Sequence, residues 1–347
     1  MKFFFTICAA VVFWILLIGG ILYIPYIKIF KHDNRVLHVF TWTEMIDPII
    51  IAQFEQETGI SVVVTYYENN EELRAKLVYS GSMQGGYDIV VPTDYMAQQL
   101  IQDNLVKKID RTKLDFWDRL DSRMCGLYFD PTNSYSIPFY WDIYGLGIDR
   151  RAFNPPAQDI SWDLVFNAQK TPGAIGMLND PREAILLGYF YYYSNLPQTI
   201  FAAQLEPVQK LLQEQKKWVG IYTDVRADYL LTTHACPLAV TQGSFMYRAQ
   251  GQHGYLTFDI PREGGFAIVD TLLIPASSTK DSLVYQFINF LYRPEIIEHH
   301  YKTYGLFPCV KNFNFPLDIS QLMPLKFLSA HIDPQVVHAL WIELKAW

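Results

Sequence analysis

The sequence predicts an α/β protein with a mostly parallel sheet, and three observations carry this prediction. At 347 residues and 40.3 kDa, the chain is too long for one small core and fits two lobes of about 150 residues each. Short apolar runs typical of buried strands alternate with helical patterns in the order β-α-β-α-β. Half of the residues are hydrophobic and 18% are charged, with a mean hydropathy of +0.06, which excludes a disordered chain, a collagen or a coiled coil.

The alternation begins with a strand over residues 36–40. Asp47 and Pro48 then predict a helix start, with Asp as the N-cap and Pro at the first helical position. Gly59 suits the left-handed position that ends such a helix. The pattern continues with strands over residues 60–66 and 88–91 and with helices over residues 71–79 and 94–104.

The second half of the chain shows the same kinds of element at wider spacing. Residues 136–141 look extended, and Gly145 begins what reads as a separate segment over 145–148. The remaining predictions are helices starting near 162–164, long helical stretches over 200–218, a strand over 265–275, and amphipathic helices over 281–292 and 294–304.

The first 35 residues differ from the rest. From Phe3 to Ile27 the chain has 25 consecutive residues without a charge, enough for a helix to cross a bilayer core of about 30 Å. A cleaved signal peptide is the alternative, but cleavage after Gly20 would put Ile18 at the −3 position, where a small residue is preferred. We therefore favour an uncleaved signal anchor. The basic residues that follow the run argue for the opposite orientation under the positive-inside rule, so the orientation stays open.

The body of the protein is acidic. Residues 36–347 hold 24 basic and 34 acidic side chains, a net charge of −10. An acidic surface repels phosphate backbones, so nucleic acid is not an expected partner, and a cationic ligand suits this charge better. Outside the apolar run the cysteines are Cys125, Cys236 and Cys309. They allow one disulfide and a spare thiol but form no framework, and without a Cys-x-x-Cys motif we expect neither a structural zinc site nor a thioredoxin-like redox motif. His299 and His300 are adjacent on a helix and point in different directions, so we expect no metal site there.

Nine short segments resemble one family in collinear order. They include Asn179-Asp180-Pro181-Arg182-Glu183 and Asp270-Thr271-Leu272-Leu273-Ile274-Pro275, and the whole set covers residues 40–44, 53–60, 67–71, 87–92, 135–138, 179–183, 261–265, 270–275 and 287–295. This series resembles the spermidine/putrescine-binding proteins, the extracytoplasmic receptors of polyamine ABC importers.

The resemblance implies a two-lobed periplasmic-binding-protein fold, with a mixed, mostly parallel sheet in each lobe and the ligand in a cleft between them. On this basis we expect residues 1–35 to be a signal peptide or anchor with a linker, residues 36–142 with 268–308 to form lobe 1, and residues 143–267 with 309–347 to form lobe 2. The implied partners are a polyamine, the permease subunits of an ABC importer and, through residues 3–27 if uncleaved, the membrane. The implied location is periplasmic or extracytoplasmic.

Seven positions match ligand-binding positions of the family. They are Trp42, Thr43, Glu44, Tyr95, Asp180, Glu183 and Asp270. Carboxylates would receive the ammonium groups, and aromatic faces would hold the methylene chain. A structural role is the alternative for Asp180, since Asp180-Pro181 also forms a well-made helix start with Glu183 at the third helical position. Trp42 alone would be read as a core residue, whereas Asp270 inside an apolar strand already points to function.

The family's aromatic positions are partly replaced. The apparent replacements are Met45, Thr241, Ile268 and Leu306. Either the ligand is a shorter or differently shaped amine, or other aromatic residues have taken over, for which the candidates are Tyr140, Trp141, Phe245 and Phe266. The sequence does not choose the preferred polyamine.

Other functional classes receive less support. The sequence has no Gly-x-Ser-x-Gly, P-loop, Gly-x-Gly-x-x-Gly or His-Glu-x-x-His motif, so we expect neither an enzyme nor a cofactor. The main alternative is a binding protein of the same fold for another small solute, although an anionic ligand would call for arginines in the cleft in place of three acids. A membrane-tethered sensor that uses the fold without transport is the other alternative.

Overall fold

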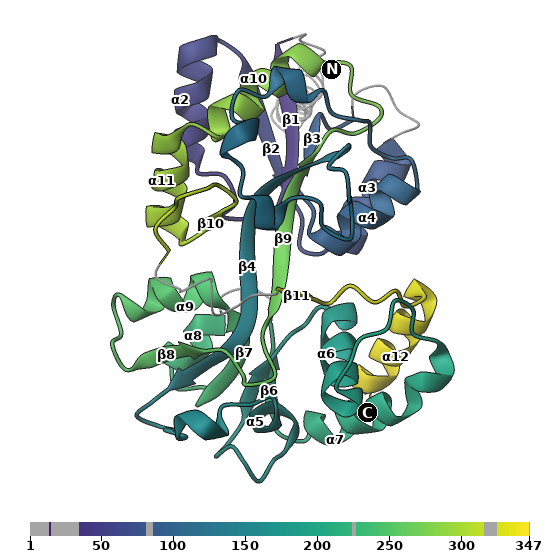
Figure 1. Cartoon of the computed structure of the whole chain (residues 1–347), viewed down its shortest axis with the longest axis vertical. Helices are drawn as coiled ribbons and strands as arrows, with labels where there is room; N and C mark the ends of the chain where they lie inside the picture. Colours follow the sequence, from purple (N-terminus) through teal and green to yellow (C-terminus); the bar gives the residue numbers. More distant parts are fainter. Residues whose placement is uncertain (1–13, 15–34, 81–85, 224–226, 316–324, 347) are drawn as a thin grey trace, which may run out of the picture.

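The computed structural model describes residues 14, 35–80, 86–223, 227–315 and 325–346. Two lobes lie one above the other in Figure 1 and are joined by two strands, β4 (Ser136–Asp149) and β9 (Phe266–Leu273). The predicted hydrophobic N-terminal helix lies, apart from residue 14, outside the described residues. Within the described ranges, no helix has both the length and the apolar character needed to cross a membrane.

The upper lobe in Figure 1 contains the predicted β-α-β-α-β series. The predicted helix start at Asp47 is confirmed, because its side chain accepts a hydrogen bond from the Ile49 N–H at 2.9 Å. Gly59 ends this helix with φ 64°, as predicted. The elements of this lobe are β1 (Val36–Thr41), α2 (Pro48–Thr58), β2 (Ser61–Tyr66), α3 (Asn70–Ser80), β3 (Ile89–Val90), α4 (Asp94–Gln102), the 3-10 turns Arg111–Lys113, Trp117–Arg119 and Ser122–Met124, α10 (Asp281–Leu291), α11 (Pro294–Tyr304) and β10 (Phe307–Pro308).

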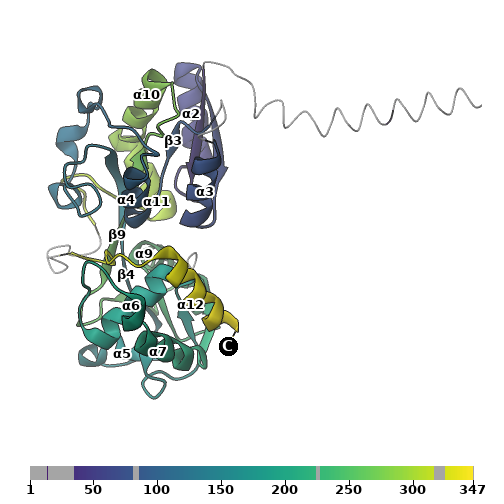
Figure 2. The same cartoon turned by 90° about the vertical axis from the view of Figure 1, so that its right-hand side faces the viewer.

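The lower lobe is built mainly from the middle of the chain and from the C-terminal helix. Its elements are the 3-10 turn Ala157–Asp159, α5 (Asp163–Phe166), β5 (Ile175–Met177), α6 (Pro181–Tyr193), the 3-10 turn Ala202–Gln204, α7 (Glu206–Lys216), β6 (Val219–Tyr222), α8 (Ala227–Thr232), β7 (Leu238–Gln242), α9 (Gly243–Gln250), β8 (Leu256–Asp259), β11 (Lys326–Phe327) and α12 (Pro334–Ala346). Figure 2 shows α12 lying against α6 and α7.

The strands of both lobes belong to one sheet, and not to a separate sheet in each lobe as predicted. Its main path runs β2-β1-β3-β9-β4-β7-β5-β6. The sheet is mixed, but it is not mostly parallel: β1 pairs in parallel with β2 and β3, whereas β4 pairs antiparallel with β7, β8, β9 and β10. The long strand β4 causes both differences, because it continues from one lobe into the other and takes antiparallel partners in each.

The glycines of β4 do not interrupt it. The sequence predicted separate segments over 136–141 and 145–148, but the structure has one buried strand of 14 residues. A Cβ atom at Gly147 would lie 2.8 Å from side-chain atoms of Leu231 and Met246, and one at Gly145 would lie 2.7 Å from the Phe258 ring. These glycines therefore allow close packing against the strand.

The predicted helical stretch over 200–218 is divided. A 3-10 turn over Ala202–Gln204 precedes α7, which begins at Glu206. Pro207 lies in the first turn of α7, where its missing N–H costs no intrahelical hydrogen bond, so it marks a new helix start.

Each lobe has its own apolar core. Leu37, Phe54 and Phe287 belong to a core on one face of the upper sheet, while Trp162 and Leu212 belong to the main core of the lower lobe. The chain after β10 first stays with the upper lobe, where Val310 forms a bridge with Leu120. The lobe boundaries given above remain a prediction.

The two lobes approach closely where α11 ends. Gly305 follows α11 in the left-handed region with φ 78°. A Cβ atom at this position would lie 2.9 Å from the Ser244 carbonyl oxygen of α9 and 3.6 Å from Cβ of Arg248. At this contact between the lobes, glycine is therefore required both by the backbone angle and by the available space.

Candidate ligand-binding site

Asp270 belongs to β9, one of the two strands that join the lobes. Its strand partner is Tyr140 of β4, and Thr93 forms an isolated bridge with it. Burial and the carboxylates of Asp94 and Asp142 raise the pKa of Asp270 well above its usual range. A buried carboxylate with two acidic neighbours is stable as an anion only when a cation is present, so this position is suited to an ammonium group.

Asp94 and Asp142 were not selected from the sequence, although both belong to this site. Asp94 is the first residue of α4 and is 4% exposed, and Asp142 lies on β4 and is 6% exposed. Burial raises the pKa of each to about 6, while the hydroxyl and backbone N–H groups of Ser244 partly oppose the rise at Asp142. The signal that selected Asp270, an acid within an apolar strand, also fits Asp142. We call Asp94, Asp142 and Asp270 the Asp270 group.

Trp42 lies beside the Asp270 group. Its indole Nε1 and the Oδ1 atom of Asp270 are both buried, and neither has a hydrogen-bond partner among the described residues. The indole N–H is close enough to Asp270 to oppose the rise in its pKa, but the geometry is not that of a hydrogen bond. The Trp42 ring centroid is 4.3 Å from that of Tyr67, which fixes the indole at this place. Asp270 Oδ1 is the only buried carboxylate oxygen without a partner in the described ranges.

Asp180 combines the two roles considered from the sequence. It caps α6, with Oδ1 accepting a hydrogen bond from the Glu183 N–H at 2.8 Å. Its other oxygen accepts a hydrogen bond at 3.1 Å from the Tyr95 hydroxyl, which belongs to α4 of the upper lobe. Tyr95 also accepts a hydrogen bond from Asn70 Nδ2 at 3.0 Å. The helix cap is confirmed, and Asp180 additionally connects the two lobes.

Glu183 lies one turn into α6 and is 5% exposed. The Tyr144 hydroxyl donates a hydrogen bond to its carboxylate at 2.6 Å. Burial and the Asp180 carboxylate raise the pKa of Glu71, the second residue of α3. Glu71 as a whole is nevertheless exposed to solvent. We call Glu71, Asp180 and Glu183 the Asp180 group.

Arg182 is a cation that acts on the Asp180 group. Burial raises the pKa of Asp180, and Arg182 is one of the groups that oppose this rise. Its guanidinium carbon lies 4.3 Å from the centroid of the Tyr95 ring. It also donates hydrogen bonds to the carbonyl oxygens of Leu328 and Ala330 at 2.7 and 3.0 Å. The Asp180 group therefore has partners within the protein, unlike Asp270 Oδ1.

Glu44 and Thr43 lie in the loop after β1, and both are exposed. Glu44 has φ 60° and accepts a hydrogen bond at 3.0 Å from Nη1 of Arg248, on α9 of the lower lobe. The structure thus brings Trp42 to Asp270, and Tyr95 to Asp180 and Glu183. It places Glu44 in an ion pair with a residue that the sequence did not select.

The four replaced aromatic positions carry side chains with little or no free surface. Met45, Thr241 and Ile268 are buried, and Leu306 packs against the upper core. Most of the aromatic residues proposed to replace them are also buried, since Tyr140, Trp141 and Phe266 are each at most 2% exposed. Phe245 keeps a partly exposed ring. The aromatic groups placed at the site are Trp42 and Tyr95.

Two surface hollows lie away from the two acidic groups, and Arg248 lines the second of them. One of about 480 Å³ at the start of α10 contains Lys107 and Lys280, whose ammonium groups already pair with Asp281 and Asp88. The other, of about 410 Å³, lies between α8 and α9. Neither contains a member of the two acidic groups.

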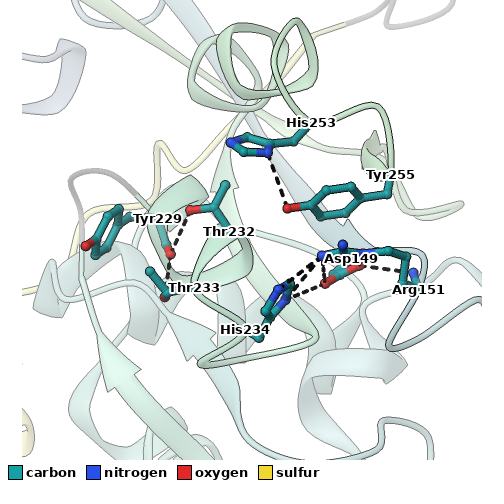
Figure 3. A network of polar contacts seen from close by, with 8 residues as sticks. All are labelled: Asp149, Arg151, Tyr229, Thr232, Thr233, His234, His253 and Tyr255. Atoms are coloured by element: carbon teal, nitrogen blue, oxygen red, sulfur yellow. Dashed lines mark hydrogen bonds and ion pairs between the residues drawn. The ribbon is translucent and has the colours of Figure 1, made fainter.

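A polar network near the second hollow is satisfied by its own members (Figure 3). Asp149 accepts hydrogen bonds from His234 at 3.0 Å and from Arg151 at 3.3 Å. A His–Asp pair can assist a nucleophile, but the Thr232 and Thr233 hydroxyls donate to the Tyr229 carbonyl oxygen at 3.1 and 2.7 Å. The drawn hydroxyls therefore do not complete a triad with His234.

Fold and geometry together describe a two-lobed protein with buried acidic residues where its lobes meet. Residues 50–320 match the family of bacterial extracellular solute-binding proteins, and the chain belongs to this family. It is 31% identical over 281 residues to the putrescine-binding periplasmic protein SpuD of Pseudomonas aeruginosa (strain UCBPP-PA14), covering 76% of each chain. It is 32% identical over 278 residues to the spermidine/putrescine-binding periplasmic protein of Escherichia coli (strain K12), covering 79% of this chain and 77% of that one.

A solved structure has the same fold. The spermidine/putrescine ABC transporter substrate-binding protein PotD from Streptococcus pneumoniae strain Canada MDR_19A, in complex with calcium and HEPES, superposes with a TM-score of 0.71 at 22% identity. The match covers 90% of this chain and 99% of that one. The two-lobed fold expected from the sequence is thus confirmed.

Proposed function

We propose that this chain is the receptor of an ABC importer and that it captures a polyamine of the putrescine/spermidine class between its lobes. The unpartnered, buried Oδ1 of Asp270, beside two further buried acids, is the observation that carries the proposal. The names of the relatives described above support the same ligand class.

The two acidic groups suit the two ends of a flexible amine. One ammonium group would lie at the Asp270 group and a second at the Asp180 group, each in charge-assisted hydrogen bonds. The faces of Trp42 and Tyr95 would contact the methylene chain, which is apolar and next to positive charge. Thr43 and Glu44 would lie at the edge of this site. Binding would favour the closed arrangement, because α4 and α6 contribute to the site from different lobes.

The closed, loaded receptor would then dock on the permease subunits. We place the protein outside the cytoplasmic membrane, with residues 3–27 as its tether if they are not cleaved. N-terminal sequencing of the mature chain tests the tether, since a start near residue 21 contradicts it. A receptor of this kind needs no cofactor and carries out no chemical reaction.

Isothermal titration calorimetry of residues 36–347 tests the function. The ligands are putrescine, cadaverine, spermidine and spermine, with γ-aminobutyrate and glutamate as controls that carry a carboxylate. We expect binding of at least one polyamine and none of the controls, together with a rise in the melting temperature that grows with ligand concentration. Binding of a control ligand in the absence of polyamine binding contradicts the proposal.

A further inference from the structure

Glu44 and Arg248 form an ion pair between the two lobes. Glu44 extends from the loop after β1, and Arg248 from α9. The distance between Glu44 Oε2 and Arg248 Nη1 is 3.0 Å, with side-chain exposures of 42% and 20%. The pair lies beside the close contact of Gly305 with α9.

Glu44 supplies the carboxylate that pairs with the guanidinium of Arg248. Its Nη1 atom is also 3.5 Å from the Tyr304 carbonyl oxygen, and its carbon atom is 5.6 Å from the centroid of the Phe245 ring. Its Nη2 atom is buried and has no hydrogen-bond partner in the described part of the chain. Among the residues that the structure describes, Glu44 is the one carboxylate in an ion pair with Arg248. A ligand that displaced Arg248 from Glu44 would leave a partly buried cation without its counter-charge, which is costly.

Glu44 therefore differs from Asp270. Asp270 has an oxygen that lacks a partner, while Glu44 already has a cation supplied by the opposite lobe. Trp42 lies next to Asp270, and Glu44 follows Trp42 by two residues in the loop after β1. Glu44 is therefore the candidate carboxylate for the further ammonium group of a longer amine whose first end lies at Asp270.

We propose that Arg248 determines specificity by occupying Glu44, so that the closed receptor takes a diamine in preference to a triamine or tetramine. The inference rests on the proposed function. Two ammonium groups are accommodated by the Asp270 and Asp180 groups, whereas a third would have to compete with Arg248 for Glu44. An unfavourable displacement of this kind is how a site rejects a closely related ligand.

The test is the ratio of spermidine to putrescine dissociation constants, measured by titration calorimetry. The wild-type chain should bind putrescine more tightly. Arg248→Met keeps much of the side-chain volume but frees Glu44, and should shift the ratio about tenfold toward spermidine, which corresponds to about 1.4 kcal/mol. Arg248→Lys keeps a cation and should retain most of the wild-type ratio. In the double variant Arg248→Met with Glu44→Gln, the ratio of dissociation constants should lose this shift toward spermidine.

Glu44→Gln alone provides an independent test that does not depend on the folding of the Arg248 variants. If Arg248 occupies Glu44, this substitution weakens both amines to the same extent and leaves the ratio unchanged. If Glu44 binds the third ammonium directly, spermidine alone weakens, and the inference is wrong. An unchanged ratio in a folded Arg248→Met variant also overturns it, while the proposed function stands. Failure of the wild-type chain to bind any amine removes both.

Discussion

The Asp270 group and the Asp180 group are both acidic, but the protein stabilises them differently. Asp180 and Glu183 accept hydrogen bonds from Tyr95 and Tyr144, and Arg182 supplies a positive charge nearby. Asp270 has an oxygen without a partner and two acidic neighbours. Asp180 and Glu183 thus have partners within the protein before a ligand arrives, whereas Asp270 in the second group lacks one for Oδ1, and we expect its charge to depend on the ligand or on a bound proton. We therefore expect substitutions in the two groups to differ in their effects on affinity and on stability.

The largest effect is expected from Asp270→Asn. Losing the charge-assisted hydrogen bond of this carboxylate should weaken polyamine binding about 100-fold. The unliganded protein should keep or gain stability, because a buried carboxylate near two others has been removed. Calorimetry and thermal unfolding without ligand measure the two effects. Asp118→Asn, an exposed position on a 3-10 turn of the upper lobe, is the control for the change in net charge. Equal affinities of Asp270→Asn and the wild type would contradict the assignment.

Acidification should weaken binding next most strongly. The pKa values of Asp94 and Asp142 are about 6 in the unliganded protein, above those of exposed aspartates, so both carboxylates take up protons as the pH falls through 6. An ammonium ligand favours the ionised forms, so the affinity should fall about 30-fold between pH 8 and pH 5. Titrations across this range check it, and Asp142→Asn should flatten the profile. An affinity that rises on acidification would be incompatible with the site.

The unliganded protein should show the opposite dependence. Because the folded-state pKa values of Asp94 and Asp142 lie above the unfolded values, the protonated forms stabilise the fold. This contribution is complete below the unfolded pKa and is lost as the pH rises through about 6. The melting temperature without ligand should therefore fall between about pH 4, near the unfolded pKa, and about pH 6, the folded pKa of both groups, and it should fall less in Asp142→Asn. A profile identical in the variant and the wild type would show that Asp142 does not titrate in this range.

A smaller effect is expected from Asp180→Asn. Asparagine is also a good N-cap, so the stability of α6 should hardly change. The lost charge should weaken polyamine binding about tenfold, less than at Asp270 because Arg182 and Tyr95 already satisfy part of this group. Chemical denaturation and calorimetry separate the two quantities. A loss of stability without a loss of affinity would show that Asp180 caps α6 but does not bind the ligand.

The smallest effect is expected from Tyr95→Phe. The substitution keeps the ring beside Arg182 but removes the hydroxyl that bonds Asp180 of the other lobe. A typical intramolecular hydrogen bond contributes about 0.5–1.5 kcal/mol, and we expect binding to weaken about threefold, at the lower end of this range. Calorimetry measures it, with Tyr193→Phe on the lower-lobe surface as a matched control. A loss as large as that of Asp270→Asn would mean that Tyr95 contacts the ligand directly.

The sequence predicts the local features of this molecule better than the distant ones. The Asp47 and Asp180 caps, the glycine at position 59 and the series of upper-lobe elements depend on neighbouring residues, and the structure confirms them. The sequence did not identify Asp94 or Arg248 as site residues, because each acts on a residue that is far away in sequence. Asp94 acts on Asp270, and Arg248 pairs with Glu44. The sequence also missed the continuity of β4. Gly145 and Gly147 indicate a break in the strand unless the side chains that pack against them are known.

The contact at Gly305 has a consequence for how the protein can vary. The closest spacing of the lobes there is set by main-chain atoms of Gly305 and Ser244, which are the same whatever the surrounding side chains are. Neighbouring surface positions can therefore change over evolution while the closed spacing stays constant. A β-carbon at position 305 would instead clash with the Ser244 carbonyl oxygen and increase the distance between the lobes, while the core of each lobe would be unchanged.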